Sequence, residues 1–167
     1  MPISEFNFTE FNDGNYFGAI SNRQEAEQIT RVLDYIDSSY TGLEHRLKQE
    51  YFFSAATAKD IVVEYKKNNK DWQSFLDLNA IHINDTQPAF VAIELLRIML
   101  DEEMLPWDEA WFNVKHSISY TIHSMQTEAC EKWPVSLLEK WLPRHLELIY
   151  LINFLFIESL KVLNKWD

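Results

Sequence analysis

Asp85 and His123 are the two polar residues whose positions most suggest chemistry, because each directly follows a short, mainly apolar segment. Residues 80–83 and 117–122 both have the pattern of a short strand. Open α/β sheets bind their ligands at the carboxyl ends of parallel strands. If these two strands are parallel neighbours, the carboxylate and the imidazole meet in one crevice, where acid–base roles can be imagined for them.

Asp85 also has a purely structural explanation. Residues 84–86 precede Pro88 and an apolar helix, so Asp85 can be an N-cap carboxylate, with Pro88 in the first helical turn. On residue type alone we favour this capping role for Asp85. His123 is harder to explain as structure, because it stands at a strand end beside Ser124.

The other reactive side chains are interpreted as structural. The sequence has no G-x-G-x-x-G, Walker, C-x-x-C or H-E-x-x-H motif, so the common nucleotide and zinc signatures are absent. Cys130 is predicted to pack within a helix, and the acidic run 101–103 to be a solvated helix end rather than a metal site. His45 and His145 are predicted to be surface or interhelical groups, and His82 to face away from its isoleucine neighbours.

The elements that must position these residues are mostly helical. Residues 1–21 are predicted to be strand or loop with a turn at Asp13-Gly14, with a short helix as an option from Tyr16 to Ile20, and 66–72 to be a solvated loop. Asn22 and Glu25 have the spacing of a capping box that begins the first long helix. Helices are predicted over residues 22–36, 43–67, 87–100, 107–117, 135–142 and 144–163. No repeat or linker is visible, so residues 1–167 are predicted to be a single unit.

The composition restricts the class of protein. A chain of 167 residues that is 47% hydrophobic can bury a substantial core. Its net charge of −11 argues against nucleic-acid or anionic-membrane partners. With one cysteine it forms no internal disulfide, and its N-terminal residues do not resemble a signal peptide, so we expect a cytoplasmic location.

Residues 148–157 form the most apolar stretch, LIYLINFLFI. Ten residues are too few to span a bilayer, which takes about 20. We therefore expect a helix that is buried on nearly every side. Because an uncovered apolar surface normally marks an interface, this stretch also predicts a homodimer or larger oligomer.

Several longer segments together resemble the α-glucan phosphorylases, the glycogen, starch and maltodextrin family. The resemblance is carried by IHINDTQPAFVAIELLRIMLDEEMLPWDEAW, SYTIHSMQTEACEKWP and LLEKWLPRHLELIYLIN, and upstream by FNDGNYFGAI, AEQITRVL and HRLKQEYFFSAAT. These motifs occur in the family's order, from about Phe6 to about Leu160. The chain is thus similar to the later part of the family's N-terminal catalytic domain.

The resemblance implies a fold and an activity. It implies a mostly helical fragment of a GT-B-like α/β glycosyltransferase domain, with two short parallel strands. Family members transfer a glucosyl unit between an α-1,4-glucan and phosphate, with the phosphate of lysine-bound pyridoxal phosphate as a catalytic acid. The domain that carries this lysine has no counterpart here, so we expect no cofactor in this chain and no complete catalytic set.

The resemblance also assigns site residues by position. Asp85 and Thr86 correspond to the N-D-T-H-P motif of the sugar pocket, and His123 to the histidine that contacts the glucosyl unit. The segment that borders the pocket corresponds to Glu128, Ala129 and Glu131. The gate loop corresponds to residues 37–40, which include Asp37 and Ser38.

The chain departs from the family pattern mainly around this pocket. The histidine of N-D-T-H-P is Gln87, and the asparagine before the pocket histidine is Ile122. The leucine and proline that follow are Gln126 and Thr127. Framework residues such as Trp107 persist, which suggests a fold kept under weaker demand for the original chemistry.

Three functions follow as hypotheses. The first is a phosphorylase segment that is inactive alone and needs a separate chain with the cofactor domain. The second is a non-catalytic module that binds an α-glucan or regulates a full-length phosphorylase. The third is a self-associating structural domain. An independent enzyme is the least expected class, because no complete constellation is present.

Overall fold

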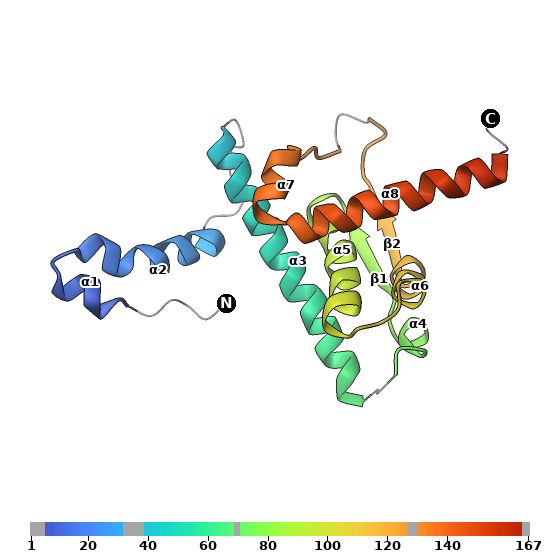
Figure 1. Ribbon diagram of the computed structural model, residues 1–167, viewed down its shortest axis with the longest axis horizontal. Helices are drawn as coiled ribbons and strands as arrows, with labels where there is room; N and C mark the ends of the chain where they lie inside the picture. Colours follow the sequence, from blue (N-terminus) through green and yellow to red (C-terminus); the bar gives the residue numbers. More distant parts are fainter. Residues whose placement is uncertain (1–5, 32–38, 69–70, 127–129, 165–167) are drawn as a thin grey trace. The chain divides into compact units, whose positions relative to one another are not determined.

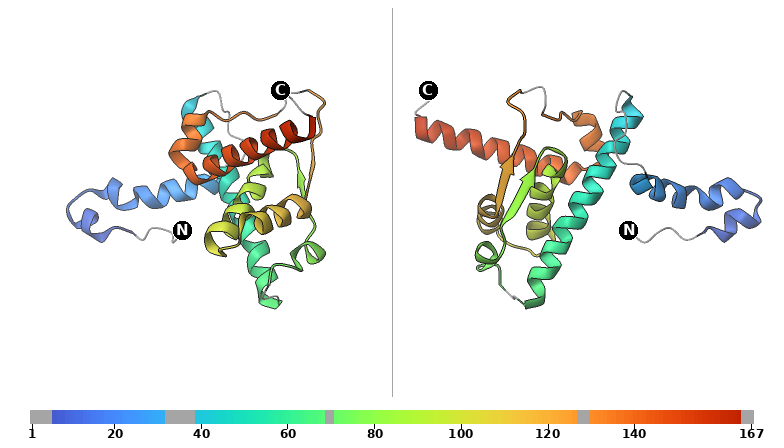
Figure 2. Two further views of the ribbon diagram at one scale, coloured as in Figure 1. Left: turned by 45° about the vertical axis from the view of Figure 1, so that its right-hand side comes forward. Right: turned by 180° about the vertical axis from the view of Figure 1, so that it is seen from behind.

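The computed structural model describes residues 6–31, 39–68, 71–126 and 130–164, and Figures 1 and 2 show how their helices and strands are arranged. The chain divides into two compact units, Met1–Gln49 and Glu50–Asp167, which are described separately. The long helix α3 (Tyr40–Asn68) contributes to both. The predicted single unit stays a prediction.

The first unit is helical where strand or loop was predicted. Helix α1 (Phe8–Asn12) begins at Asn7, whose side chain accepts from the N–H groups of Thr9 and Glu10 at 3.2 and 3.3 Å. This capping fixes a helix, so the spaced phenylalanines that suggested a strand instead form a ring cluster with Tyr16. The predicted turn at Asp13-Gly14 is confirmed, with Gly14 at a φ of 83°.

Helix α2 (Tyr16–Arg31) begins six residues before the predicted start at Asn22. The Asn15 side chain accepts from the N–H of Gly18 at 3.0 Å, so Asn15 occupies the capping position expected of Asn22. The predicted continuation to residue 36 lies outside the described residues. Within this unit, Gln49 of α3 donates to the carbonyl of Ile29 at 2.8 Å.

In the second unit, α3 continues through Lys66 and Lys67, so the predicted solvated loop over 66–72 is wrong for its first residues. The described residues before Trp72 are exposed, as predicted, whereas Trp72 is buried against Tyr65 and Phe75 with ring centroids 5.4 Å away from each. This aromatic cluster turns the chain into the short helix α4 (Phe75–Leu78) and then into the sheet.

The sheet consists of β1 (Ile81–Asn84) and β2 (Ile118–Thr121), which are parallel. Ile81 is in register with Ile118, and Asn84 with Thr121. The crossover between them contains the 3-10 helix η1 (Gln87–Ala89), α5 (Phe90–Arg97), the π-helix η2 (Ile98–Glu102) and α6 (Trp107–Ser117). The predicted parallel arrangement and the mostly helical fold are confirmed.

Helix α5 is the centre of this unit. Six of its eight residues are buried, and it packs against α6 and α8 (Pro143–Asn164). Helix α7 (Val135–Trp141) packs against α8 through its own buried leucines. Residues 130–134 between β2 and α7 are irregular, so the prediction that Cys130 packs in a helix is wrong, and its side chain is exposed.

The burial predicted for residues 148–157 is also wrong. The first turns of α8 are buried through Leu146 and Leu148, but nearly all residues from Ile149 to Val162 are exposed. The pattern was correctly read as a helix, but the second unit covers only its beginning. None of the described helices is both long enough and apolar enough to cross a membrane.

Because α5 is the centre of the second unit, we expect Leu95→Ala to lower the free energy of unfolding by about 2–5 kcal/mol. Leu95 is fully buried, so its truncation leaves a cavity. The matched control is Leu78→Ala, which removes the same atoms from a side chain that is 61% exposed. Urea denaturation followed by circular dichroism measures both, and equal losses would contradict the packing described here.

Candidate functional site

The carboxyl edge of the sheet brings several polar side chains together. Strand alternation places His82 and Asn84 of β1 on the same face as Ser119 and Thr121 of β2. The chain continues from β2 to His123, whose Nε2 lies 2.5 Å from Oδ1 of Asn84. Since an amide oxygen only accepts, Nε2 of His123 is the donor in this contact.

Asn84, rather than Asp85, is therefore the residue that meets His123. Asp85 has a φ of 74°, in the left-handed region that is unfavourable for residues with a side chain. Two hydrogen bonds hold it there: its N–H donates to the carbonyl of Thr121, and its Oδ1 accepts from the N–H of Thr86, both at 2.8 Å. Asp85 and His123 both lie at this edge of the sheet, but within the described part of the chain they bond to Thr86 and Asn84 rather than to each other.

The predicted N-cap is wrong as well. Helix η1 begins at Gln87, its capping residue is Thr86, and Thr86 makes no side-chain capping bond. The Asp85 carboxylate accepts instead from the N–H of Thr86, the capping residue itself, because the left-handed backbone of Asp85 turns its side chain toward that group. Pro88 does lie in the first helical turn, as predicted.

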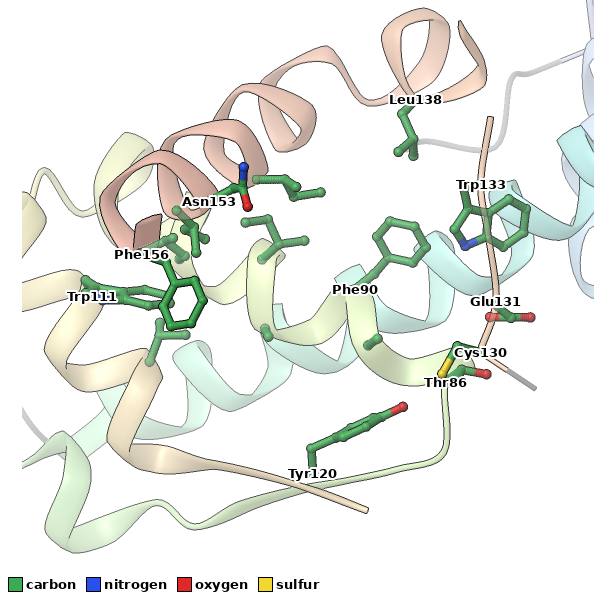
Figure 3. Close-up of a pocket in the computed structure, with 17 residues that line it drawn as sticks. Thr86, Phe90, Trp111, Tyr120, Cys130, Glu131, Trp133, Leu138, Asn153 and Phe156 are labelled. Carbon is green, nitrogen blue, oxygen red and sulfur yellow. The ribbon is translucent and has the colours of Figure 1, made fainter. Parts of the chain in front are cut away.

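A pocket of about 640 Å³ lies beside this edge of the sheet (Figure 3). Aromatic and aliphatic side chains line most of it, and Thr86 and Glu131 lie near one another at one end. The lining residues come from η1, α5, α6, β2, the 130–133 segment, α7 and α8. A largely apolar cavity with a few polar groups at one end is the usual form of a small-molecule site.

Tyr120 connects the pocket to the edge residues. Figure 3 shows its ring extending toward Thr86 and Cys130. Partial burial raises the pKa of the Tyr120 phenol, and the negative charges of Cys130, Asp85 and Glu131 raise it further. Tyr120 thus stays a neutral hydrogen-bond donor at physiological pH, within the electrostatic reach of two of the predicted site residues.

The structure describes four of the eight site residues that were predicted. Thr86 and Glu131 line the pocket, while Asp85 and His123 stand at the sheet edge. Asp37, Ser38, Glu128 and Ala129 lie outside the described residues. Asn84 and Tyr120 were missed, although their position and alternation in the two strands could have indicated both.

Comparison with known proteins decides the family. The model of the carbohydrate phosphorylases matches residues 1–167. Glycogen phosphorylase of Saccharomyces cerevisiae is 46% identical over 158 residues, which are 95% of this chain and 18% of the relative. Glycogen phosphorylase 2 of Dictyostelium discoideum is 44% identical over 99% of this chain and 16% of its own length. The liver form of glycogen phosphorylase of Bos taurus is 42% identical over 98% of this chain and 20% of its own.

The chain belongs to the carbohydrate phosphorylase family. It spans less than a quarter of the length of these phosphorylase relatives, so it holds only part of the phosphorylase fold. The described pocket does not fit the phosphate of pyridoxal phosphate, because neither lysine nor arginine is among its lining residues. We therefore derive no step through that cofactor.

This phosphorylase segment also contains a buried ionic cluster that was not predicted from the sequence. Glu94 of α5 is 3% exposed, and its Oε2 accepts from Nε2 of His145 at 2.5 Å and from the Tyr51 hydroxyl at 3.1 Å. Arg97 forms two hydrogen bonds with the same carboxylate, at 2.8 and 3.0 Å. The i,i+3 spacing of Glu94 and Arg97 was the only sequence signal for it.

The acidic run 101–103 extends this cluster: it lies at a helix end and stays partly exposed, as predicted, but its carboxylates are ion-paired. Asp101 forms a double contact with Arg144, at 2.8 and 2.9 Å. Glu102 binds Arg97 and Lys59, and Glu103 binds Lys66. His145 was predicted to be a surface or interhelical group. It is interhelical, because its bond to Glu94 joins α8 to α5.

The cluster is structural rather than catalytic. Burial raises the pKa of Glu94, but hydrogen bonds from His145 and Arg97, together with the charge on Arg97, outweigh it and lower the pKa to about 2. Burial and the Glu94 charge raise the pKa of Tyr51 to about 12. A carboxylate that is permanently ionised and 3% exposed is a poor proton donor at neutral pH.

Glu94→Gln should lower the free energy of unfolding by about 2–4 kcal/mol, because it replaces the buried carboxylate that Arg97, His145 and Tyr51 bind with a neutral amide. Glu64→Gln is the matched control: it breaks an exposed i,i+3 pair with Lys67 and should cost about 0.5 kcal/mol or less. Chemical denaturation at pH 7 measures both. If the two variants lose equal stability, the cluster is not the stabilising element described here.

The lowered pKa of Glu94 also predicts an acid dependence. Its folded-state pKa of about 2 is below its ordinary value of 4.5, so its contribution is complete above pH 4.5 and is lost as the pH falls toward 2. The wild type should therefore lose about 2–3 kcal/mol more than Glu94→Gln between pH 6 and pH 2.5. Urea denaturation at several pH values measures this. If the free energy of unfolding falls equally with pH in the two proteins, the assignment to Glu94 is contradicted.

Proposed function

We propose that this segment supplies one wall of the glucosyl pocket of an α-glucan phosphorylase and is active only together with the family's cofactor domain. The observation that carries the proposal is the carboxyl edge of the parallel strands, where His123 and Asn84 are joined beside Asp85. Of these residues, Asp85 and His123 are positions at which the resemblance places sugar contacts. The relatives that this chain matches are glycogen phosphorylases about five to six times as long as it is.

The geometry supports sugar binding in this half-site. Asn84, His123 and Thr86 offer neutral donors and acceptors, and Asp85 and Glu131 offer carboxylates, the groups that recognise hydroxyls. Of these residues, Thr86 and Glu131 line the pocket together with Tyr120, Trp133 and Phe90, and aromatic faces of this kind cover apolar faces of ligands. The glucosyl unit would therefore be held by these residues, while the phosphate and the catalytic acid would be supplied by phosphorylase domains outside residues 1–167.

The second candidate is a non-catalytic module that binds an α-glucan or regulates a phosphorylase, in a cytoplasmic setting like the first. The departures Gln87 and Ile122 favour it, since both lie next to retained pocket positions. Calorimetry with maltooligosaccharides separates the two candidates. The module binds the oligosaccharide without a partner chain, whereas the half-site requires one.

The proposal is tested by mixing the chain with a polypeptide that carries the cofactor domain and the other parts of a phosphorylase, loaded with pyridoxal phosphate. We expect glucose 1-phosphate release from glycogen and phosphate only in the mixture. His123→Ala should lower this rate at least about tenfold without loss of association, because a contact to the sugar is lost.

His82→Ala is the matched control. His82 is a second imidazole on the same polar face, bonded to Thr121 at 2.7 Å, but it lies at the second residue of β1, away from the edge. It should keep the activity of the wild-type mixture within about twofold. Association without activity would favour the binding module, and an absence of association would overturn the proposal.

A further inference from the structure

The polar face of the two-stranded sheet carries two histidines that bond across the strands in the same way. Nε2 of His82 lies 2.7 Å from Oγ1 of Thr121. Nε2 of His123 lies 2.5 Å from Oδ1 of Asn84. The strands are parallel neighbours (Figure 1), and each bond joins a residue of β1 to the residue two positions beyond its register partner. The two imidazoles therefore have equivalent places on one face and differ in the chemistry of their partners.

The two partners constrain the imidazoles differently. The hydroxyl of Thr121 both donates and accepts, so it bonds either tautomer of His82. The amide oxygen of Asn84 only accepts, so Nε2 of His123 carries the proton that it donates. When the ring is neutral, its Nδ1 is then unprotonated and is an acceptor. Asn84 thus fixes the tautomer of His123, whereas Thr121 leaves that of His82 open.

The Nδ1 atom of His123 is available to a ligand. The residue is exposed, and among the described parts of the chain its ring bonds to Asn84 alone. An unprotonated ring nitrogen bonds a group that donates, such as a hydroxyl. It does not bond an unprotonated phosphate oxygen, because that atom also only accepts. The tautomer of His123 therefore decides which kind of ligand group this position takes.

We propose that Asn84 is a positioning residue that holds His123 with its Nδ1 unprotonated, so that this position takes a hydroxyl of the glucosyl unit and not a phosphate oxygen. The identity of the ligand rests on the proposed function, whereas the tautomer is a property of this chain alone. Asn84 acts through the orientation and the protonation of the His123 ring. The resemblance assigned sugar contacts to Asp85 and His123 and no role to Asn84.

The tautomer is measured on the whole chain without a ligand. 15N-labelled histidines are observed by NMR at about pH 8.5, above the ordinary titration range of imidazole. The His123→Ala spectrum identifies the signal of His123. We expect this ring to show one protonated and one unprotonated nitrogen, with the proton on Nε2. Averaged nitrogen shifts, which indicate exchange between tautomers, would overturn the proposal. So would a proton on Nδ1, because the Asn84 amide would then present its NH2 group to the ring.

Variants at Asn84 test what sets the tautomer. Asn84→Leu removes the acceptor at similar size, and the His123 shifts should become averaged. Asn84→Asp keeps an acceptor oxygen in the same place and should keep the proton on Nε2. Thr121→Val is the matched control, because it removes the hydroxyl that bonds His82 and should leave the His123 signal in place. An Asn84→Leu chain that keeps the wild-type signal of His123 would contradict the proposal, and the wild-type spectrum decides if this variant does not fold.

The role in binding is tested in the assembled mixture by a double-mutant cycle. Asn84→Leu should lower kcat/KM for the glucan about three- to tenfold, because the His123 ring is no longer held as an acceptor. In a chain that already carries His123→Ala, the same substitution should change kcat/KM by less than about twofold. Losses that multiply would show that Asn84 acts apart from His123 and would overturn the positioning role.

The ligand group is tested with the two substrates separately. Maltoheptaose without phosphate should move the Nδ1 signal of His123 in the mixture, and inorganic phosphate without glucan should leave it in place. Movement by phosphate alone would overturn the choice of a hydroxyl. An inactive mixture in which Asn84 still sets the tautomer contradicts the proposed function and its ligand. An active mixture in which the His123 ring exchanges between tautomers contradicts only the inference about Asn84.

Discussion

The carboxylate of Glu94 is the group on which the second unit depends. It is buried among three helices: Tyr51 comes from α3, Arg97 from α5 itself and His145 from α8. A buried charge is tolerated only when its hydrogen-bonding capacity is filled, and here four donor contacts fill it. The fixed position of α5 that results also fixes η1 and the end of β1, where the candidate sugar-binding residues lie.

The same cluster explains why a π-helix follows α5. Arg97 bonds to Glu94 behind it and to Glu102 ahead of it, and Glu102 is bound in turn by Lys59 of α3. Asp101, one residue earlier, faces Arg144 at the start of α8. The wider turn of η2 presents Asp101 to α8 and Glu102 to α3. In a regular α-helical turn these two side chains would be spaced differently around the helix axis. Pairing thus replaces solvation for an acidic run in a chain of net charge −11.

Periodicity and strand composition were sufficient to predict much of the fold. The apolar stripe of α3, the short strands at 81–84 and 118–121, and the helices on either side of Pro143 all follow from local pattern. What the pattern could not supply was tertiary: the ring cluster of Phe6, Phe11 and Tyr16, and the burial of Trp72. Apolar content predicted burial of α8 beyond Leu148, yet burial requires neighbours on several sides, and the described residues of the second unit supply too few of them there.

The candidate site was predictable in its place but not in its contacts. The residues at the strand ends, Asp85 and His123, could be chosen from the sequence, whereas the left-handed backbone of Asp85 and the bond between His123 and Asn84 required the structure.

Our central claim is that this edge still holds a glucosyl unit once the rest of a phosphorylase is present. The most direct measurement is the NMR signal of 13C-labelled histidines of this chain in the assembled mixture, as maltoheptaose is added. We predict that the His123 signal shifts while that of His82 stays in place. Saturating oligosaccharide that leaves the His123 signal unmoved would contradict the account.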